Sequence, residues 1–204
     1  MKWIKWKSLM ATCIVCVLPI LLGIALWNSL PDTMAIHFNV YNEPDNFASK
    51  GFVVFGIPLL MAAMQIFCCL VNDINSYKKG VRIKFERVVR WIIPLMSVVL
   101  QTAIIGFGLG WNMDMRRIAV FIVGVVFLVT GNYLPKLDYV KHYDVDTEKA
   151  RKINRTLGYG TIIMGVLSLV SLFMPPIASV IWLFLLILYV VLCVIYAIKV
   201  EREK

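Results

Sequence analysis

The chain has 204 residues, of which 60% are hydrophobic and 16% are charged, and its mean hydropathy is +0.80. Such a composition excludes an ordinary soluble globular protein. The net charge of +9 would suit a nucleic-acid-binding protein, but most basic residues lie in short segments between long apolar runs, where they act as topology determinants. We therefore expect the lipid bilayer as a partner and no direct contact with nucleic acid.

The apolar runs approach or reach the roughly 20 residues that a helix needs to cross a bilayer. They are too long and too little alternating for the strands of a barrel. The sequence therefore predicts an all-α integral membrane protein with six transmembrane helices, the first a retained signal anchor kinked at Pro19. In chain order the expected spans are residues 8–27, 51–71, 91–110, 118–134, 158–174 and 179–198.

The distribution of positive charge predicts the orientation of these spans. Segments rich in Lys and Arg stay in the cytoplasm. Both termini and the basic segments 72–90 and 135–157 are therefore expected to be cytoplasmic, and residues 28–50 are expected to form a short extracellular cap. The lysines and arginines outside the expected cytoplasmic segments are Lys50, Arg116 and Arg117.

The expected cap carries local signals for a compact hairpin. Pro31 ends the first span, because proline restricts the residue before it and lacks an N–H donor. Ile36 and Phe38 alternate with polar neighbours, which is typical of a half-buried extended strand. A turn follows at residues 42–45, where Asn42 tolerates a left-handed conformation.

The cytoplasmic segment 138–157 predicts a short basic helix that leads into the fifth span. Asp144, Asp146 and Thr147 are residue types that cap helix N-termini, and Glu148 suits the positive end of the helix dipole. The basic residues that follow would attract anionic lipid headgroups or dock a partner protein, and the sequence leaves both readings open. They are Lys149, Arg151, Lys152 and Arg155.

Signatures of catalysis and of ion coupling are absent from the sequence. The expected span cores contain no ionisable residue, which argues against a proton-coupled pump or an ion exchanger. No zinc-protease, hydrolase or P-loop motif is present, and His37 and His142 are expected on opposite sides of the membrane. His37 and the acids of the cap could hold a divalent cation, but acids that cap turns explain them as well. We expect no enzyme, no cofactor and no metal site.

The cap resembles a known bacterial sequence unit, the domain of unknown function 1648 (DUF1648). Its pattern is roughly LP-x-x-x-P-x-HF-x-x-x-G-x-PD-x-x-x-x-K, directly after a first span. Ala35 stands where the second proline is usual, and Asn42 stands where the glycine is usual. The matching positions are Leu30, Pro31, His37, Phe38, Pro44, Asp45 and Lys50.

A second segment, Gly-Asn-Tyr-Leu-Pro-Lys at residues 131–136, resembles the SdpI family of bacterial immunity proteins, as do six expected spans in 204 residues. The Gly-Ile-Arg-Thr-Pro-Trp segment of that family is absent here, and Ala150 and Asn154 replace its usual Trp and His. The resemblance implies a DUF1648-like unit at residues 1–71 and an SdpI-like four-span unit at residues 72–204.

The resemblance also implies a function. Such a protein would sit in the bacterial plasma membrane, protect the cell against a secreted antimicrobial peptide toxin, and signal to a cytosolic transcriptional repressor. Two alternatives stay open, namely a small transporter or permeation protein, suggested by prolines within three spans, and a membrane sensor without an immunity role.

The two motifs supply the candidate site residues. The resemblance assigns the outer set to toxin binding and the inner set to a relay toward the cytosol. The outer set is Leu30, Pro31, His37, Phe38, Asn42, Pro44, Asp45 and Lys50. The inner set is Asn132, Tyr133, Pro135, Lys136, Lys152 and Arg155.

Overall fold

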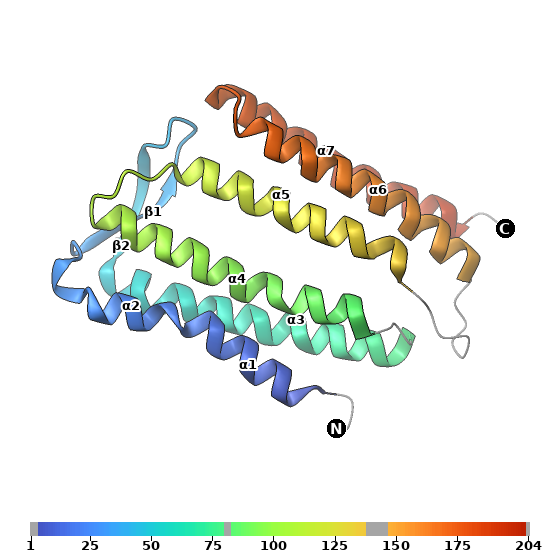
Figure 1. Ribbon diagram of the computed structural model, residues 1–204, viewed down its shortest axis with the longest axis horizontal. Coiled ribbons are helices and arrows are strands. Elements are labelled where there is room, and N and C mark those ends of the chain that lie inside the picture. Colours follow the sequence, from blue (N-terminus) through green and yellow to red (C-terminus); the bar gives the residue numbers. More distant parts are fainter. Residues whose placement is uncertain (1–3, 80–82, 138–146, 203–204) are drawn as a thin grey trace. The chain divides into compact units, whose positions relative to one another are not determined.

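The computed structural model describes residues 4–79, 83–137 and 147–202, and these residues are mostly helical (Figure 1). Five helical stretches among them are long and apolar enough to cross a membrane, as expected for a multi-pass membrane protein. These stretches are Trp6–Ala25, Phe52–Tyr77, Glu86–Gly108, Met115–Lys136 and Glu148–Ser171.

The sixth expected span falls in helix α7 (Pro176–Arg202). Within it, the described apolar stretch Phe184–Val200 is shorter than the other five. Six spans with both termini in the cytoplasm therefore stay a prediction.

The chain divides into two compact units. The first unit comprises Met1–Asn75 and Arg87–Ile118, and the second comprises Ser76–Glu86 and Ala119–Lys204. The boundary after residue 71, which the sequence suggests between two domains, stays a prediction.

The first unit consists of helices and one two-stranded sheet. Helix α1 (Trp6–Val17) ends just before Leu18, and α2 begins just after it at Pro19. The break expected at Pro19 is therefore confirmed. The hairpin expected in the cap is also confirmed, because β1 and β2 pair antiparallel. The unit also contains most of α3 (Ile57–Lys79) and α4 (Ile83–Gly108). Its remaining elements are α2 (Pro19–Ala25), η1 (Trp27–Ser29), β1 (Thr33–Phe38), β2 (Pro44–Ser49) and the π-helix η2 (Phe52–Gly56).

Pro94 removes one backbone hydrogen bond from α4, and a glutamine of α3 supplies a replacement donor. Proline has no N–H, so the carbonyl of Arg90, four residues earlier, loses its usual donor. Gln65 Nε2 donates to Arg90 O at 2.8 Å. In hydrocarbon each unsatisfied backbone group costs several kcal/mol, which makes such a repair necessary.

A glutamine side chain also supplies a missing donor at the start of the second span. In the π-helix η2 the N–H of Ile57 bonds to Phe52 O, and the next bond of this pattern would join residue 58 to Val53 O. Residue 58 is a proline, and Gln101 Nε2 donates to Val53 O at 2.6 Å instead. Pro58 and Pro94 are thus each matched by a side-chain donor from a neighbouring helix.

Removing the Gln65 amide should destabilise the first unit, and removing Pro94 should reverse the loss. In Gln65→Leu the Arg90 carbonyl loses its donor, which costs about 1–3 kcal/mol for a buried group. Adding Pro94→Ala supplies a backbone N–H at the right place in the ladder. The free energy of unfolding, measured by titration with a denaturing detergent, should then recover. Pro58→Ala in the Gln65→Leu background is the control, and rescue no better than this control would contradict the assignment.

Helices α3 and α4 extend further than the hydropathy pattern predicts. Segment 72–90 is helical over its described residues, and Asp73 and Arg90 lie inside these helices with only 2% and 3% of their surface exposed. The expected cores of the spans contain neither residue, but the helices continue beyond the expected ends of the spans and bury this pair there. Hydropathy falls where polar residues begin, but a helix can continue through polar residues.

In the second unit, glycines bring α5 (Met115–Tyr133) and α6 (Thr147–Ser171) into close contact. A Cβ added at Gly131 would lie 2.8 Å from the carbonyl oxygen of Gly158, and one added at Gly165 would lie 3.0 Å from that of Gly124. The two contacts are two helical turns apart, so they lie on one face of each helix. Gly131, Gly158, Gly124 and Gly165 thus serve the close packing of the two helices.

Hydrogen bonds between side chains join α6 to α7 along their length. Thr161 Oγ1 lies 3.0 Å from Tyr189 OH, and Trp182 Nε1 donates to Ser168 Oγ at 2.9 Å. A third bond runs from Tyr196 OH to Thr156 Oγ1 at 3.2 Å. The two helices are therefore antiparallel (Figure 1), and the last turns of α7 lie beside the first turns of α6.

Candidate functional site

The hairpin cap is seated on the end of α4. Met34 and Ala35 of β1 are buried, whereas β2 is mostly exposed. A Cβ at Gly108 would lie 2.9 Å from Met34 Cε, and the Phe38 ring meets the Phe107 ring edge-on with centroids 4.7 Å apart. The cap therefore has one side packed on the helices and one side open.

Asn42 fixes the turn of the hairpin. It has φ of 65°, so the left-handed conformation expected at this position is confirmed. Its Nδ2 donates to Met113 O at 2.9 Å, and the N–H of Met115 donates to its Oδ1 at 2.8 Å. The asparagine thus ties the turn to the segment before α5, a link that a glycine at this position could not make.

Lys50 fixes the base of the hairpin to the end of the first span. Its Nζ lies 3.4 Å from Trp27 O, 3.3 Å from Leu30 O and 3.2 Å from Asp32 Oδ1. The same ammonium lies 4.9 Å from the centroid of the Trp27 ring. A cation is favourable beside the free carbonyls at a helix C-terminus. The structure therefore places Lys50 in the framework of the cap, together with Leu30, Phe38 and Asn42.

The other four predicted residues are exposed. His37 Nδ1 lies 2.5 Å from Asp45 Oδ1, and the two side chains are 66% and 44% exposed. Pro31 and Pro44 are exposed as well. The structure adds Tyr41 and Phe47, which are 68% and 54% exposed and which the motif pattern did not single out. This surface combines one polar pair with aromatic rings, a composition suited to binding a peptide.

In the described part of the chain, no three His, Cys, Asp or Glu side chains come together as a metal site would require. His37 and Asp45 form a pair, while Glu43 accepts a hydrogen bond from Asn39 Nδ2 at 2.9 Å and Asp32 faces Lys50. The cap acids are thus engaged in turns and ion pairs.

The inner motif forms a compact group in the second unit. Lys136 Nζ donates to Asn132 Oδ1 at 2.7 Å and lies 5.6 Å from the centroid of the Tyr133 ring. Pro135 packs against Gly158, where an added Cβ would lie 2.4 Å from its Cγ. The structure thus brings the motif to the first turns of α6.

The α6 residues of the inner set are exposed. Lys152 and Arg155 lie on the surface of the helix, which begins at Thr147 and includes the basic helix expected there. The capping candidates Asp144 and Asp146, and also His142, lie outside the described residues.

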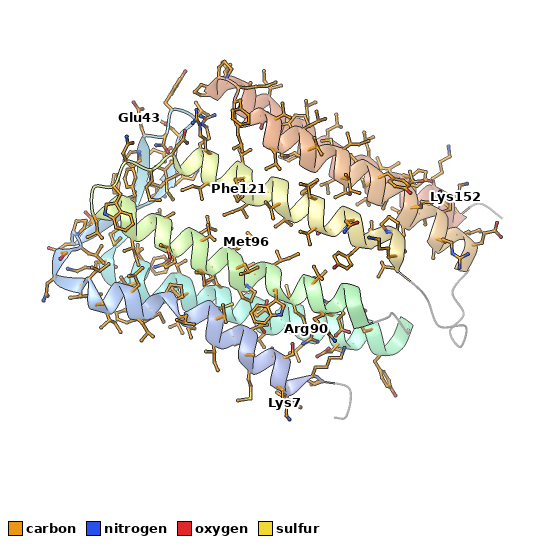
Figure 2. The ribbon with its side chains drawn as sticks, in the orientation of Figure 1. Lys7, Glu43, Arg90, Met96, Phe121 and Lys152 are labelled. Atoms are coloured by element: carbon orange, nitrogen blue, oxygen red, sulfur yellow. The ribbon has the colours of Figure 1, made fainter. Side chains whose placement is uncertain are left out.

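A buried ion pair in the first unit belongs to neither sequence motif. Asp73 and Arg90 are in direct contact through Oδ1 and Nη2, and the N–H of Lys5 donates to Asp73 Oδ2 at 3.1 Å. Figure 2 shows Arg90 among the helices and Glu43 on the hairpin, toward opposite ends of this unit. The signal available in the sequence is an acid just after one apolar run and an arginine just before the next.

Comparison with known proteins singles out the same region. Residues 14–62 match the family model of a domain of unknown function, DUF1648. The chain carries a DUF1648 domain. No curated protein and no solved structure matches the chain significantly. The DUF1648 segment runs from α1 into α3 and contains the whole hairpin, including both departures from the usual pattern, Ala35 and Asn42.

Proposed function

We propose that this chain is an immunity protein of a bacterial plasma membrane that protects the cell against a secreted antimicrobial peptide toxin. In this proposal it spans the membrane six times with both termini in the cytoplasm, and the DUF1648 hairpin meets the toxin outside. The proposal assigns no catalytic step and no cofactor.

One observation carries the proposal: the hairpin is held rigidly while its recognition groups stay exposed. Lys50 and Asn42 fix the base and the turn, and the His37–Asp45 pair remains on the open side. A preorganised surface loses little conformational entropy on binding, and aromatic side chains next to a polar pair are typical of binding hot spots. Exposed Tyr41 and Phe47 supply the aromatic part.

The inner motif supports a second part of the proposal, signalling to a cytosolic repressor. Lys136 is held by Asn132 and Tyr133, and Lys152 and Arg155 are exposed on the adjoining helix. A basic surface of this kind suits an acidic patch on a cytosolic protein.

Expression of the chain in a sensitive bacterium should raise survival against at least one member of a panel of purified secreted antimicrobial peptides. The double variant His37→Ala with Asp45→Ala should reduce the tolerated peptide concentration roughly tenfold, as expected when about 1.4 kcal/mol of binding is lost. The measurement is the minimal inhibitory concentration at matched membrane expression.

Thr33→Ala is the matched control, because Thr33 is exposed on the same hairpin and lies outside the predicted set. It should leave protection unchanged. Unchanged survival with the unaltered chain across the whole panel would overturn the immunity proposal. Protection that the double variant retains in full would remove the His37–Asp45 pair from the recognition surface.

A further inference from the structure

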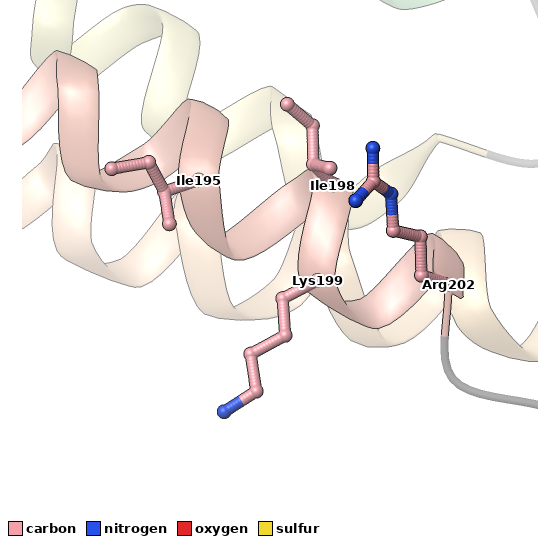
Figure 3. A pocket seen from close by; sticks show the side chains of 4 residues that line it. All are labelled: Ile195, Ile198, Lys199 and Arg202. Atoms are coloured by element: carbon pink, nitrogen blue, oxygen red, sulfur yellow. The ribbon is translucent and has the colours of Figure 1, made fainter.

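The last turns of α7 line an open pocket of about 550 Å³ (Figure 3). Residues spaced by three, four and seven positions share one face of a helix, and the described lining has this spacing. Its apolar part is uncovered, with Ile195 55% and Ile198 45% exposed. The described lining consists of Ile195, Ile198, Lys199 and Arg202.

The pocket lies where an apolar helix meets its first charges. Helix α7 has 27 residues and is therefore about 40 Å long, against about 30 Å for the hydrocarbon core of a bilayer. Its sequence is uncharged from Pro176 to Ile198, and Lys199, Glu201 and Arg202 follow in its last turn. In the six-span arrangement proposed above, the isoleucines lie at the depth of acyl chains and the two cations at the depth of headgroups.

More positive charge lies at the same end of the second unit. The bond between Tyr196 and Thr156 sets the end of α7 beside the start of α6, where Lys152 and Arg155 are exposed. Figure 2 shows Lys152 near the C-terminal end of the chain. A phosphate group at this level therefore meets a basic surface.

We propose that this pocket binds an anionic phospholipid. Lys199 and Arg202 hold the phosphate, and an acyl chain lies along Ile195 and Ile198. Figure 3 shows the two cationic side chains leaving the helix in different directions, and both line the pocket. The apolar half of the pocket selects a lipid over a soluble phosphate. The site is independent of the immunity function proposed above.

The test measures binding of palmitoyl-oleoyl-phosphatidylglycerol to the purified full chain by native mass spectrometry, with phosphatidylcholine of the same chains and soluble glycerol phosphate as comparison ligands. The unaltered chain should retain phosphatidylglycerol in preference to both. Lys199→Gln with Arg202→Gln should weaken this binding about thirtyfold, from about 1 kcal/mol for each basic residue near a headgroup.

The matched control is Lys152→Gln with Arg155→Gln, which removes the same charge from the same end of the unit outside the described pocket lining. It should weaken binding by less than a third of that factor. Equal losses in the two double variants would overturn the site, because they would show attraction by overall charge. Retention of glycerol phosphate as strong as that of phosphatidylglycerol would overturn the lipid as occupant.

Discussion

Asp73→Ala should destabilise the first unit by about 3–5 kcal/mol, the usual effect of breaking a buried ion pair. The side chains of Asp73 and Arg90 are 1% and 2% exposed, so the variant removes the Asp73 carboxylate from beside a buried arginine charge. It also removes the acceptor of the Lys5 N–H, which holds the start of α1 against α3. The free energy of unfolding in mixed detergent micelles measures the loss.

A double-mutant cycle separates the pair from the rest of the packing. Asp73→Leu with Arg90→Leu removes both charges and should be more stable than either single variant, since hydrophobic replacement of a buried pair is often neutral. Arg117→Ala is the control at an exposed pair, because Arg117 is 60% exposed and lies 3.2 Å from Asp114. It should cost less than about 1 kcal/mol. A double variant as unstable as the sum of the single variants would show that the two side chains are not coupled.

Gly131→Ala should destabilise the second unit by about 1–3 kcal/mol, the cost of overpacking a tight contact. The added Cβ would lie 2.8 Å from Gly158 O and 2.8 Å from Ile162 N. Both are backbone atoms of α6, so the clash is relieved only if the helices move apart. Gly158→Ala should have a similar effect, since its Cβ would meet Pro135 and Gly131 O.

Gly51→Ala is the matched control for the glycine contacts. Gly51 has helical φ and ψ of −61° and −43°, and a Cβ there meets nothing within 4 Å. This variant should be neutral or should stabilise by about 0.4–1 kcal/mol. The thermal midpoint of each variant in detergent, measured at matched lipid content, checks the prediction. A loss at Gly51 as large as that at Gly131 would contradict the contact argument.

Local signals allowed much of the cap to be predicted from the sequence. Pro31 ends the helix, alternation marks the strand, and Asn42 marks a left-handed turn, and each of these depends only on residues nearby. The partners of the cap could not be predicted, because Met113 and Phe107 come from a distant part of the chain. Four of the eight predicted cap residues consequently turn out to hold the framework, which a motif match cannot distinguish from recognition.

The membrane interior was predicted less completely. Apolar runs indicate where helices cross but not where they end, so Asp73 and Arg90 were assigned to a loop. The sequence shows prolines and glutamines in the spans, yet only the structure pairs Gln65 with the Arg90 carbonyl and Gln101 with the Val53 carbonyl. The pairing of glycines across α5 and α6 likewise depends on the register of the two helices, which the sequence does not show.

The two anchors of the hairpin differ in when they can form during synthesis. Lys50 reaches the carbonyls of Trp27 and Leu30, 23 and 20 residues earlier, so the base can close as soon as the second span has been inserted. Asn42 bonds to Met113, 71 residues later, and must wait until α4 is in place. The tip of the cap is therefore the last part of this surface to be fixed, and an incomplete nascent chain carries a closed base with a turn not yet tied to Met113.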